Sequence, residues 1–267
     1  MNITITNTNI NRLKKLFSII PDTFSHVPLK IGKYENGNCF ARIDSTDING
    51  DISFYGNVEL DDIKELEPSS MMIIRLQTNR AVLSTLFNPI YDSIQINKTR
   101  ILVQTKNKKM SIQLYQLLEK DIYELPETNV DMYDAVISNN VGLKNDGYII
   151  LDLDKEEMKD FIDSSSILTP NKTEDLRFNV KTNKDRLVVY SEDYIKNNFE
   201  YTFTSVLDDK IKIDTKYDYN LIDVMSKILK FKDYDISTLI SNPVVSFTIT
   251  SEKDGITSTI SVPAQKD

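Results

Sequence analysis

The sequence predicts an α+β fold of two similar domains, each with two amphipathic helices packed on antiparallel sheets. Its 267 residues suit two domains, by the usual prior of ~100–200 residues per domain. Each half follows the same plan of a helix, several strands, a second helix and further strands. With only 7 glycines and 8 prolines, the chain favours long regular elements over loops.

In the first half, residues 6–20 carry apolar side chains at helical spacing and end before Pro21, which predicts the first helix. Alternating strands with polar turns follow over residues 29–58. A short second helix is expected at residues 79–87. The remaining strands of this half are expected at 71–76, 93–96, 100–104 and 110–118.

An acidic stretch with only scattered apolar residues, 119–132, interrupts this pattern and predicts an extended connector. We therefore expect a first domain at 1–120, a connector at 121–133 and a second domain at 134–267.

The second half repeats the plan, and its most regular helical pattern is that of residues 219–231. Another helix is expected at 154–167. A Lys-Asp-Gly hairpin turn at 253–255 joins the last two strands. The strands of this half are expected at 148–153, 176–180, 187–191, 200–206, 210–214, 238–240, 244–250 and 257–262.

The composition limits the classes of protein. A net charge of −8 disfavours a nucleic-acid-binding surface unless basic side chains gather on one face. A single cysteine, Cys39, excludes a disulfide framework and favours a reducing compartment. We find neither a signal-peptide pattern nor an apolar run of membrane-spanning length, and expect an intracellular protein without membrane contact.

Several stretches together resemble the DNA sliding clamps, the family of proliferating cell nuclear antigen and of the T-even-like phage clamps. Residues 11–17 (NRLKKLF) are similar to the first clamp helix, and residues 41–48 (ARIDSTDI) to a strand segment that follows it. The remaining similar stretches are 111–114 running into Leu125-Pro126-Glu127, 241–244 (SNPV) and 262–264 (VPA). The resemblance covers essentially the whole chain.

The resemblance implies a non-enzymatic processivity factor. Such a chain would form a head-to-tail homotrimeric ring with helices inside and sheets outside, closed between residues 110–116 and residues 199–205 of the next chain. The ring would encircle duplex DNA, tether a replicative DNA polymerase and need an ATP-dependent clamp loader. A composition rich in Asn, Ile, Lys and Asp fits a viral protein, which would act in the host cytoplasm if the virus is a bacteriophage.

A ring on DNA needs positive charge without base readout, because phosphate contacts are independent of sequence. Eight basic residues on the four predicted helices are the candidates for this contact, although ordinary solvated helix faces carry such charges too. Acidic neighbours on the third helix weaken it as a phosphate track. The candidates are Arg12, Lys14, Lys15, Arg80, Lys155, Lys159, Lys227 and Lys230.

Polymerases and other clients of the family insert apolar side chains beside the connector. The resemblance places an apolar pocket there, although some of its members, Ile43 and Pro243 above all, would serve equally as core or strand-end residues. Its residues would be Ile43, Ile48, Ile122, Leu125, Pro243, Val262 and Pro263.

We expect no metal, cofactor or catalytic residue. The aspartates at 44–51 do not match the ligand positions of a calcium loop, His26 is the one histidine, and a Walker phosphate loop is lacking. Two alternatives remain open. One is a clamp-fold transcription cofactor or checkpoint-type scaffold. The other is a metal-dependent α+β enzyme that uses Asp44, Asp47 and Asp51.

Overall fold

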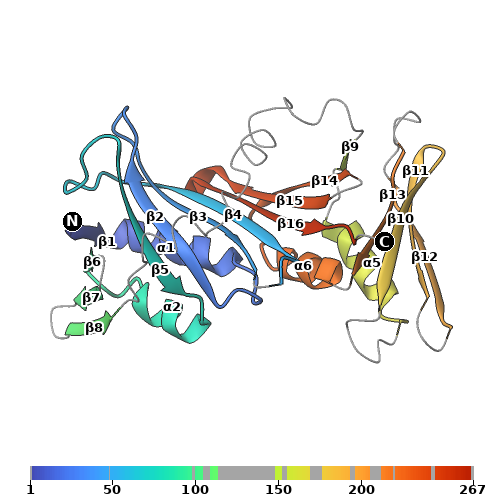
Figure 1. Ribbon diagram of the computed structural model, residues 1–267, viewed down its shortest axis with the longest axis horizontal. Coiled ribbons are helices and arrows are strands. Elements are labelled where there is room, and N and C mark those ends of the chain that lie inside the picture. The colour runs from blue at the N-terminus through green and yellow to red at the C-terminus, as the bar shows by residue number, and fades with distance from the viewer. Residues whose placement is uncertain are drawn as a thin grey trace. The chain divides into compact units, whose positions relative to one another are not determined.

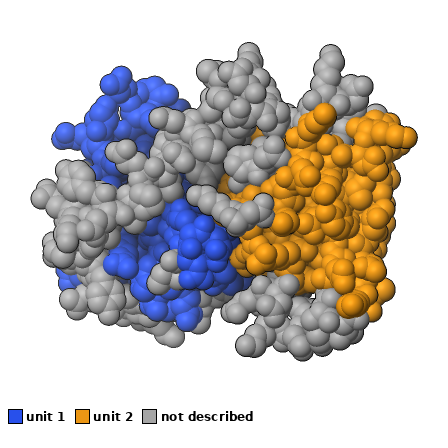
Figure 2. Space-filling model, turned by 45° about the vertical axis from the view of Figure 1, so that its right-hand side comes forward, with its two compact units in different colours: residues 1–130, 250–258 blue, residues 131–249, 259–267 orange. Residues whose placement is uncertain are grey.

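The computed structural model shows a mixed arrangement of helices and antiparallel sheets (Figure 1). It describes residues 2–47, 49–97, 100–104, 109–113, 148–151, 155–168, 176–192, 196–204, 212–218, 220–241 and 244–265. The chain divides into two compact units, coloured blue and orange in Figure 2. The first unit is Met1–Val130 with Thr250–Ser258, and the second is Asp131–Ile249 with Thr259–Asp267.

The part of the first unit that the structure describes contains two helices and two sets of antiparallel strands. One sheet has the strand order β1-β6-β7-β8, and the other strands run in the order β5-β2-β3-β4. The elements are β1 (Asn2–Thr6), α1 (Asn7–Ile19), β2 (His26–Lys33), β3 (Cys39–Thr46), β4 (Ser53–Leu60), β5 (Ser70–Gln77), α2 (Arg80–Leu86), β6 (Ser93–Asn97), β7 (Arg100–Gln104) and β8 (Lys109–Gln113).

The second unit has the same kinds of element. Its strands run in the orders β9-β14-β15-β16 and β13-β10-β11-β12. The elements are β9 (Tyr148–Leu151), α5 (Lys155–Ser165), β10 (Arg177–Asn183), β11 (Arg186–Glu192), β12 (Asn198–Thr202), β13 (Asp214–Asp218), α6 (Asn220–Ile228), β14 (Asp235–Ser241), β15 (Val244–Ser251), the 3-10 turn η2 (Glu252–Asp254) and β16 (Ile256–Pro263).

The two units repeat one another element by element. Counting described elements alone, each runs strand, helix, four strands, helix and three strands along the chain. In each, the strand before the first helix joins the last three strands, while the middle four form their own set. The duplication predicted from the sequence is therefore present in the strand order as well as in the order of elements.

Helix α1 lies against β4 in the first unit, and a glycine makes this close approach possible. A Cβ atom on Gly56 would lie 2.8 Å from Cδ1 of Leu16. Leu13 and Leu16 are fully buried on this side of the helix, and the Phe17 ring packs against Phe87 with centroids 4.6 Å apart. The apolar stripe of α1 thus fixes which of its residues face away from the sheet.

An aromatic cluster forms part of the core of the second unit. The ring of Phe161 on α5 lies within 5.4–6.1 Å of four other aromatic rings, measured between centroids. They belong to Phe178, Phe199, Tyr201 and Phe203. These rings come from β10, β12 and the residue after it, so α5 is anchored on the middle set of strands.

The structure corrects several predicted boundaries. Residues 2–6, which carried no predicted strand, form β1, because Ile3 and Ile5 alternate into the core and pair with β6. The strand expected at 210–214 is β13, displaced to Asp214–Asp218. The tip of the β15–β16 hairpin, Thr250–Ser258, belongs to the first unit although its flanking residues belong to the second. The predicted connector at 121–133 lies outside the described residues.

Candidate DNA-contact and partner-contact residues

Helix α1 carries three cationic side chains and no acidic one: Arg12, Lys14 and Lys15. Because the apolar stripe is buried against the sheet, these three side chains lie on its remaining surface. Lys14 is exposed, and Arg12 and Lys15 are half-buried. The helix therefore has the charge expected of a phosphate-contacting element, but its three cations have different surroundings.

Arg12 is held by the end of β4. Its Nη1 donates hydrogen bonds to the Glu59 carbonyl at 3.2 Å and to Oδ1 of Asp61 at 2.9 Å. Asn9, one turn earlier and fully buried, fixes the same segment. Its amide donates to the Asp61 carbonyl at 3.1 Å, and its Oδ1 accepts from the Asp61 N–H at 2.8 Å. An asparagine near the start of α1 thus holds a strand end instead of capping the helix.

Lys15 is held by the hairpin tip that the last part of the chain contributes to the first unit. Its Nζ lies 2.7 Å from Oδ1 of Asp254. The tip is fixed on β4, because the Glu59 N–H donates to the Gly255 carbonyl at 2.9 Å. Gly255 has a φ of 62°, and a Cβ there would lie 3.1 Å from the Cβ of Glu59, so only glycine fits easily.

The predicted cations of the second unit also differ from one another. Lys159 and Lys230 are exposed. Lys155 donates from Nζ to the Lys232 carbonyl at 2.7 Å and to the Tyr234 carbonyl at 2.9 Å, so it ties the start of α5 to the turn after α6. Arg80 begins α2, and its side chain lies outside the described residues.

Lys227 needs a correction, because the sequence places it on a solvated helix face. In the structure, Lys227 is only 8% exposed. It follows Val224 by three positions and precedes Ile228, so its aliphatic stem borders the apolar stripe of α6. We therefore assign Lys227 to the packed side of α6 rather than to an open cationic surface.

Two residues of the predicted partner pocket need a similar correction. Ile43 is fully buried on β3, opposite Gly56, and Val262 is 1% exposed. Both side chains therefore pack in the cores of their units. Pro263 is exposed. Ile48, Ile122, Leu125 and Pro243 lie outside the described residues, so the pocket itself stays a prediction.

Two of the three aspartates considered above as metal ligands, Asp44 and Asp47, accept bonds from protein groups. Asp47 Oδ1 accepts from the N–H groups of Asp51 at 2.7 Å and Ile52 at 3.1 Å, which closes the turn. Asp44 Oδ2 pairs with Lys30 Nζ at 2.6 Å. Among the described residues, no group of three or more His, Cys, Asp or Glu side chains is placed to hold a metal ion.

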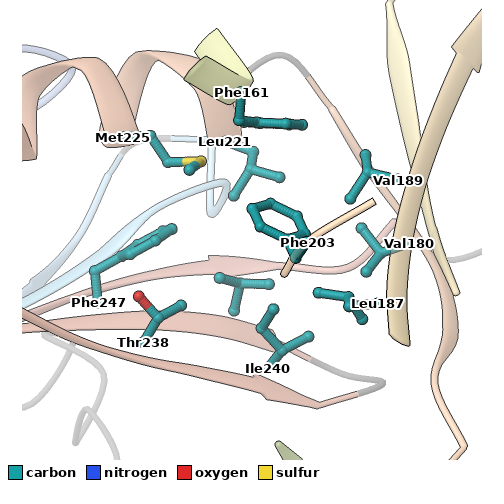
Figure 3. Close-up of a pocket in the computed structure, with 11 residues that line it drawn as sticks. Phe161, Val180, Leu187, Val189, Phe203, Leu221, Met225, Thr238, Ile240 and Phe247 are labelled. Carbon is teal, nitrogen blue, oxygen red and sulfur yellow. The ribbon is translucent and has the colours of Figure 1, made fainter. Parts of the chain in front are cut away.

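A cavity of about 20 Å³ lies in the core of the second unit (Figure 3). Its lining includes Phe161 of α5, Met225 of α6 and Phe247 of β15, and Thr238 is its one polar residue. Oγ1 of Thr238 is buried and has no hydrogen-bond partner in the described structure. A space of this size corresponds to about one water molecule, which needs two to four polar partners. We therefore interpret the cavity as a packing defect and not as a ligand site.

Comparison with solved structures identifies the fold. The chain is similar to the DNA polymerase III subunit beta from Pseudomonas aeruginosa, with a TM-score of 0.65 and 13% identity over 100% of this chain and 66% of that chain. It is similar to proliferating cellular nuclear antigen from Entamoeba histolytica, with a TM-score of 0.61 and 10% identity over 99% of this chain and 98% of the other. It is also similar to a chain from a structure of the C-terminal region of FEN-1 bound to A. fulgidus PCNA, with a TM-score of 0.61 and 9% identity over 100% and 98%.

No protein-family model matches the sequence, and no curated protein matches it either. The structural matches nevertheless cover the whole chain, and the internal duplication seen above runs through the same residues. The protein has the DNA sliding clamp fold, as the sequence resemblance predicted.

The residues that hold Arg12 and Lys15 were not foreseen from the sequence. Asp61 lies 49 positions from Arg12, and Asp254 lies 239 positions from Lys15. Neither sequence separation matches the spacing of contacts within a helix or a hairpin, so no local pattern could have predicted these contacts.

None of the helices in the described part of the chain combines the length and the apolar character that a membrane span requires.

Proposed function

We propose that the protein is a DNA sliding clamp, a non-enzymatic processivity factor that encircles duplex DNA and tethers a replicative polymerase and other clients. The single observation that carries the proposal is the clamp fold over the whole chain. Such a ring keeps an enzyme on its template by topology, and an ATP-dependent loader opens it. It would act inside the cell at replication sites, in the host cytoplasm if the protein comes from a bacteriophage.

The proposed ring is a head-to-tail homotrimer, and the duplicated strand order supports its closure. Within the first unit, the edge of β4 is covered by the hairpin tip that leads into β16. The counterparts of β4 and β16 in the repeat are β12 and β8. Both stand at the ends of their sheets in the described chain. If β8 of one chain covers β12 of the next, the same pairing recurs at every junction and the exposed edges of these two strands are covered.

The proposed DNA contact uses cations on the helices, and three of the eight predicted residues are best placed for it. Lys14, Lys159 and Lys230 are exposed and lie on or directly after α1, α5 and α6. Their contact would be with phosphates and independent of sequence. Because only three of the eight predicted cations are found exposed among the described residues and the chain carries a net charge of −8, the direct hold on DNA should be weak.

A threading experiment tests the proposal without a loader. A closed ring can pass over the free end of linear duplex DNA but not onto a covalently closed circle. We expect retention on linear duplex whose ends are blocked by biotin–streptavidin after the protein has threaded, loss of retention when both ends are blocked before the protein is added, and no retention on closed circular DNA. Equal retention on all three substrates would show ordinary surface binding and contradict the clamp.

A second candidate is a clamp-fold scaffold of transcription or checkpoint type that does not travel on DNA. The observation that favours it is that several of the predicted DNA-contact cations are already bound to other groups of the protein. Arg12 and Lys15 are bound to carboxylates, and Lys155 is bound to carbonyl groups. A scaffold would form its complexes without DNA. It would show no end-dependent retention at any salt concentration, so the same threading experiment separates the two candidates.

A further inference from the structure

The two paired cations of α1 and their carboxylates form one closed network in the first unit. Arg12 and Lys15 are three positions apart and so share a side of the helix. Glu59 connects their partners, because its carbonyl accepts from Arg12 while its N–H donates to Gly255, the residue after Asp254. The chain of contacts runs from α1 to the end of β4, to the hairpin tip and back to α1.

Both aspartates are held in place by other contacts, Asp61 through its backbone and Asp254 through its side chain. Asn9 bonds to the N–H and the carbonyl of Asp61. The side chain of Asp254 is only 16% exposed, and its Oδ2 lies 3.4 Å from Oγ of Ser251. The Asp61 backbone and the Asp254 side chain thus have contacts of their own, which keep both carboxylates within reach of the two cations.

We infer that Asp61 and Asp254 set the strength of the DNA contact by holding Arg12 and Lys15 as internal substitutes for phosphate. A phosphate that approaches either cation must compete with a carboxylate that already lies 2.9 or 2.7 Å from it. The exchange replaces one anion by another and adds little net attraction. Lys14 is left as the α1 cation that meets DNA directly. This inference rests on the proposed DNA contact and names the residues that regulate it.

The physical consequence is a low affinity for DNA, because the protein's own carboxylates already neutralise two of the cations on α1. A cation already neutralised by the protein releases few counterions from DNA, so it contributes little to the salt dependence of binding. A low affinity suits a ring that must slide along DNA, because tight contacts with phosphates would stop its movement. Asp61 and Asp254 would therefore keep α1 basic in sequence but only weakly attractive to DNA.

The test measures equilibrium binding of the full chain to a short labelled duplex by fluorescence anisotropy at several salt concentrations. The variants are Asp61→Asn, Asp254→Asn and the two combined. The matched control is Asp62→Asn, which removes the same charge next to Asp61 but releases Lys33, a residue of β2, from a pair of 2.7 Å. Asp61 is 53% exposed, so Asp61→Asn should fold normally even if the half-buried Asp254 tolerates change poorly.

We expect the combined variant to bind roughly threefold to tenfold more tightly, and its salt slope to steepen by about 0.9 for each released cation. The control should change binding less than twofold. Adding Lys15→Gln to Asp254→Asn should abolish the gain, because the released cation is then missing. Gains of equal size in the control and the variants would overturn the inference, since total charge would explain them.

The outcomes also separate this inference from the proposed function. If the unaltered chain binds duplex through Lys14, and Asp61→Asn and Asp254→Asn behave like the control, the inference fails while the DNA contact stands. If neither the unaltered chain nor the combined variant binds duplex even at low salt, both fail. Binding by the combined variant alone would support the inference.

Discussion

Asn9 offers the sharpest test of how α1 is fixed in the first unit. It is fully buried, and its side-chain amide makes two hydrogen bonds to the backbone of Asp61, at 2.8 and 3.1 Å. Asn9→Ala removes both bonds and leaves a backbone donor and an acceptor without their partner. At about 1–1.5 kcal/mol for each lost bond, we expect a destabilisation of about 2–3 kcal/mol.

A neighbouring residue provides the matched control. Asn11 lies on the same helix and is exposed, so Asn11→Ala removes no buried bond and replaces asparagine by a better helix former. We expect this substitution to change stability by less than about 0.5 kcal/mol, or to raise it slightly.

Hydrogen exchange followed by mass spectrometry is the appropriate assay, because it reports on α1 itself and not on the mixed unfolding of two units. An opening free energy lowered by about 2–3 kcal/mol corresponds to exchange of α1 amides roughly 30- to 150-fold faster. Equal exchange in the two variants would refute the reasoning, because the buried bonds of Asn9 would then contribute nothing to holding the helix.

Three further substitutions test particular contacts. Thr238→Val removes a buried hydroxyl without a partner and should stabilise the second unit by about 1 kcal/mol, whereas Thr182→Val, which loses a bond from the Ile213 N–H at 3.1 Å, should destabilise it by a similar amount in thermal melts. Lys30→Met leaves the carboxylate of Asp44, which is 1% exposed, without its ion pair and should cost about 3 kcal/mol in urea denaturation. Lys33→Met removes a pair with Asp62, whose side chain is 61% exposed, and should destabilise the protein much less. Burial, and secondarily Arg75, lower the pKa of His26 from its ordinary 6.5, so the folded state favours the neutral ring. This contribution to stability is present above pH 6.5 and declines as the pH falls through that value, and His26→Gln should remove the decline from unfolding midpoints measured between pH 7.5 and 5.5.

The sequence was sufficient for the elements with strong local patterns. The helical spacing over residues 6–20 and 219–231 predicted α1 and α6 to within a few residues, because one apolar stripe on each must be buried. The duplicated plan and the clamp-like stretches predicted the fold that the structural comparisons show. Such patterns depend on near neighbours in the chain, which a sequence displays directly.

Whether a candidate site residue is exposed, buried or ion-paired could not be predicted from such local patterns. Whether Lys15 is free or paired depends on Asp254, which comes beside it only when the hairpin tip packs in the first unit. The burial of Ile43 depends on how closely α1 approaches the sheet over Gly56. Lys227 appears polar by composition, but its stem borders the apolar stripe. Each outcome follows from tertiary packing rather than from local pattern.

The measurement that most directly tests the central claim is the mass of the purified chain in solution, by light scattering after size exclusion over a series of concentrations. The proposed head-to-tail ring predicts a species of three times the 30.7 kDa chain that becomes dominant as concentration rises. A strict monomer at every concentration would contradict a ring that closes by itself through β8 and β12.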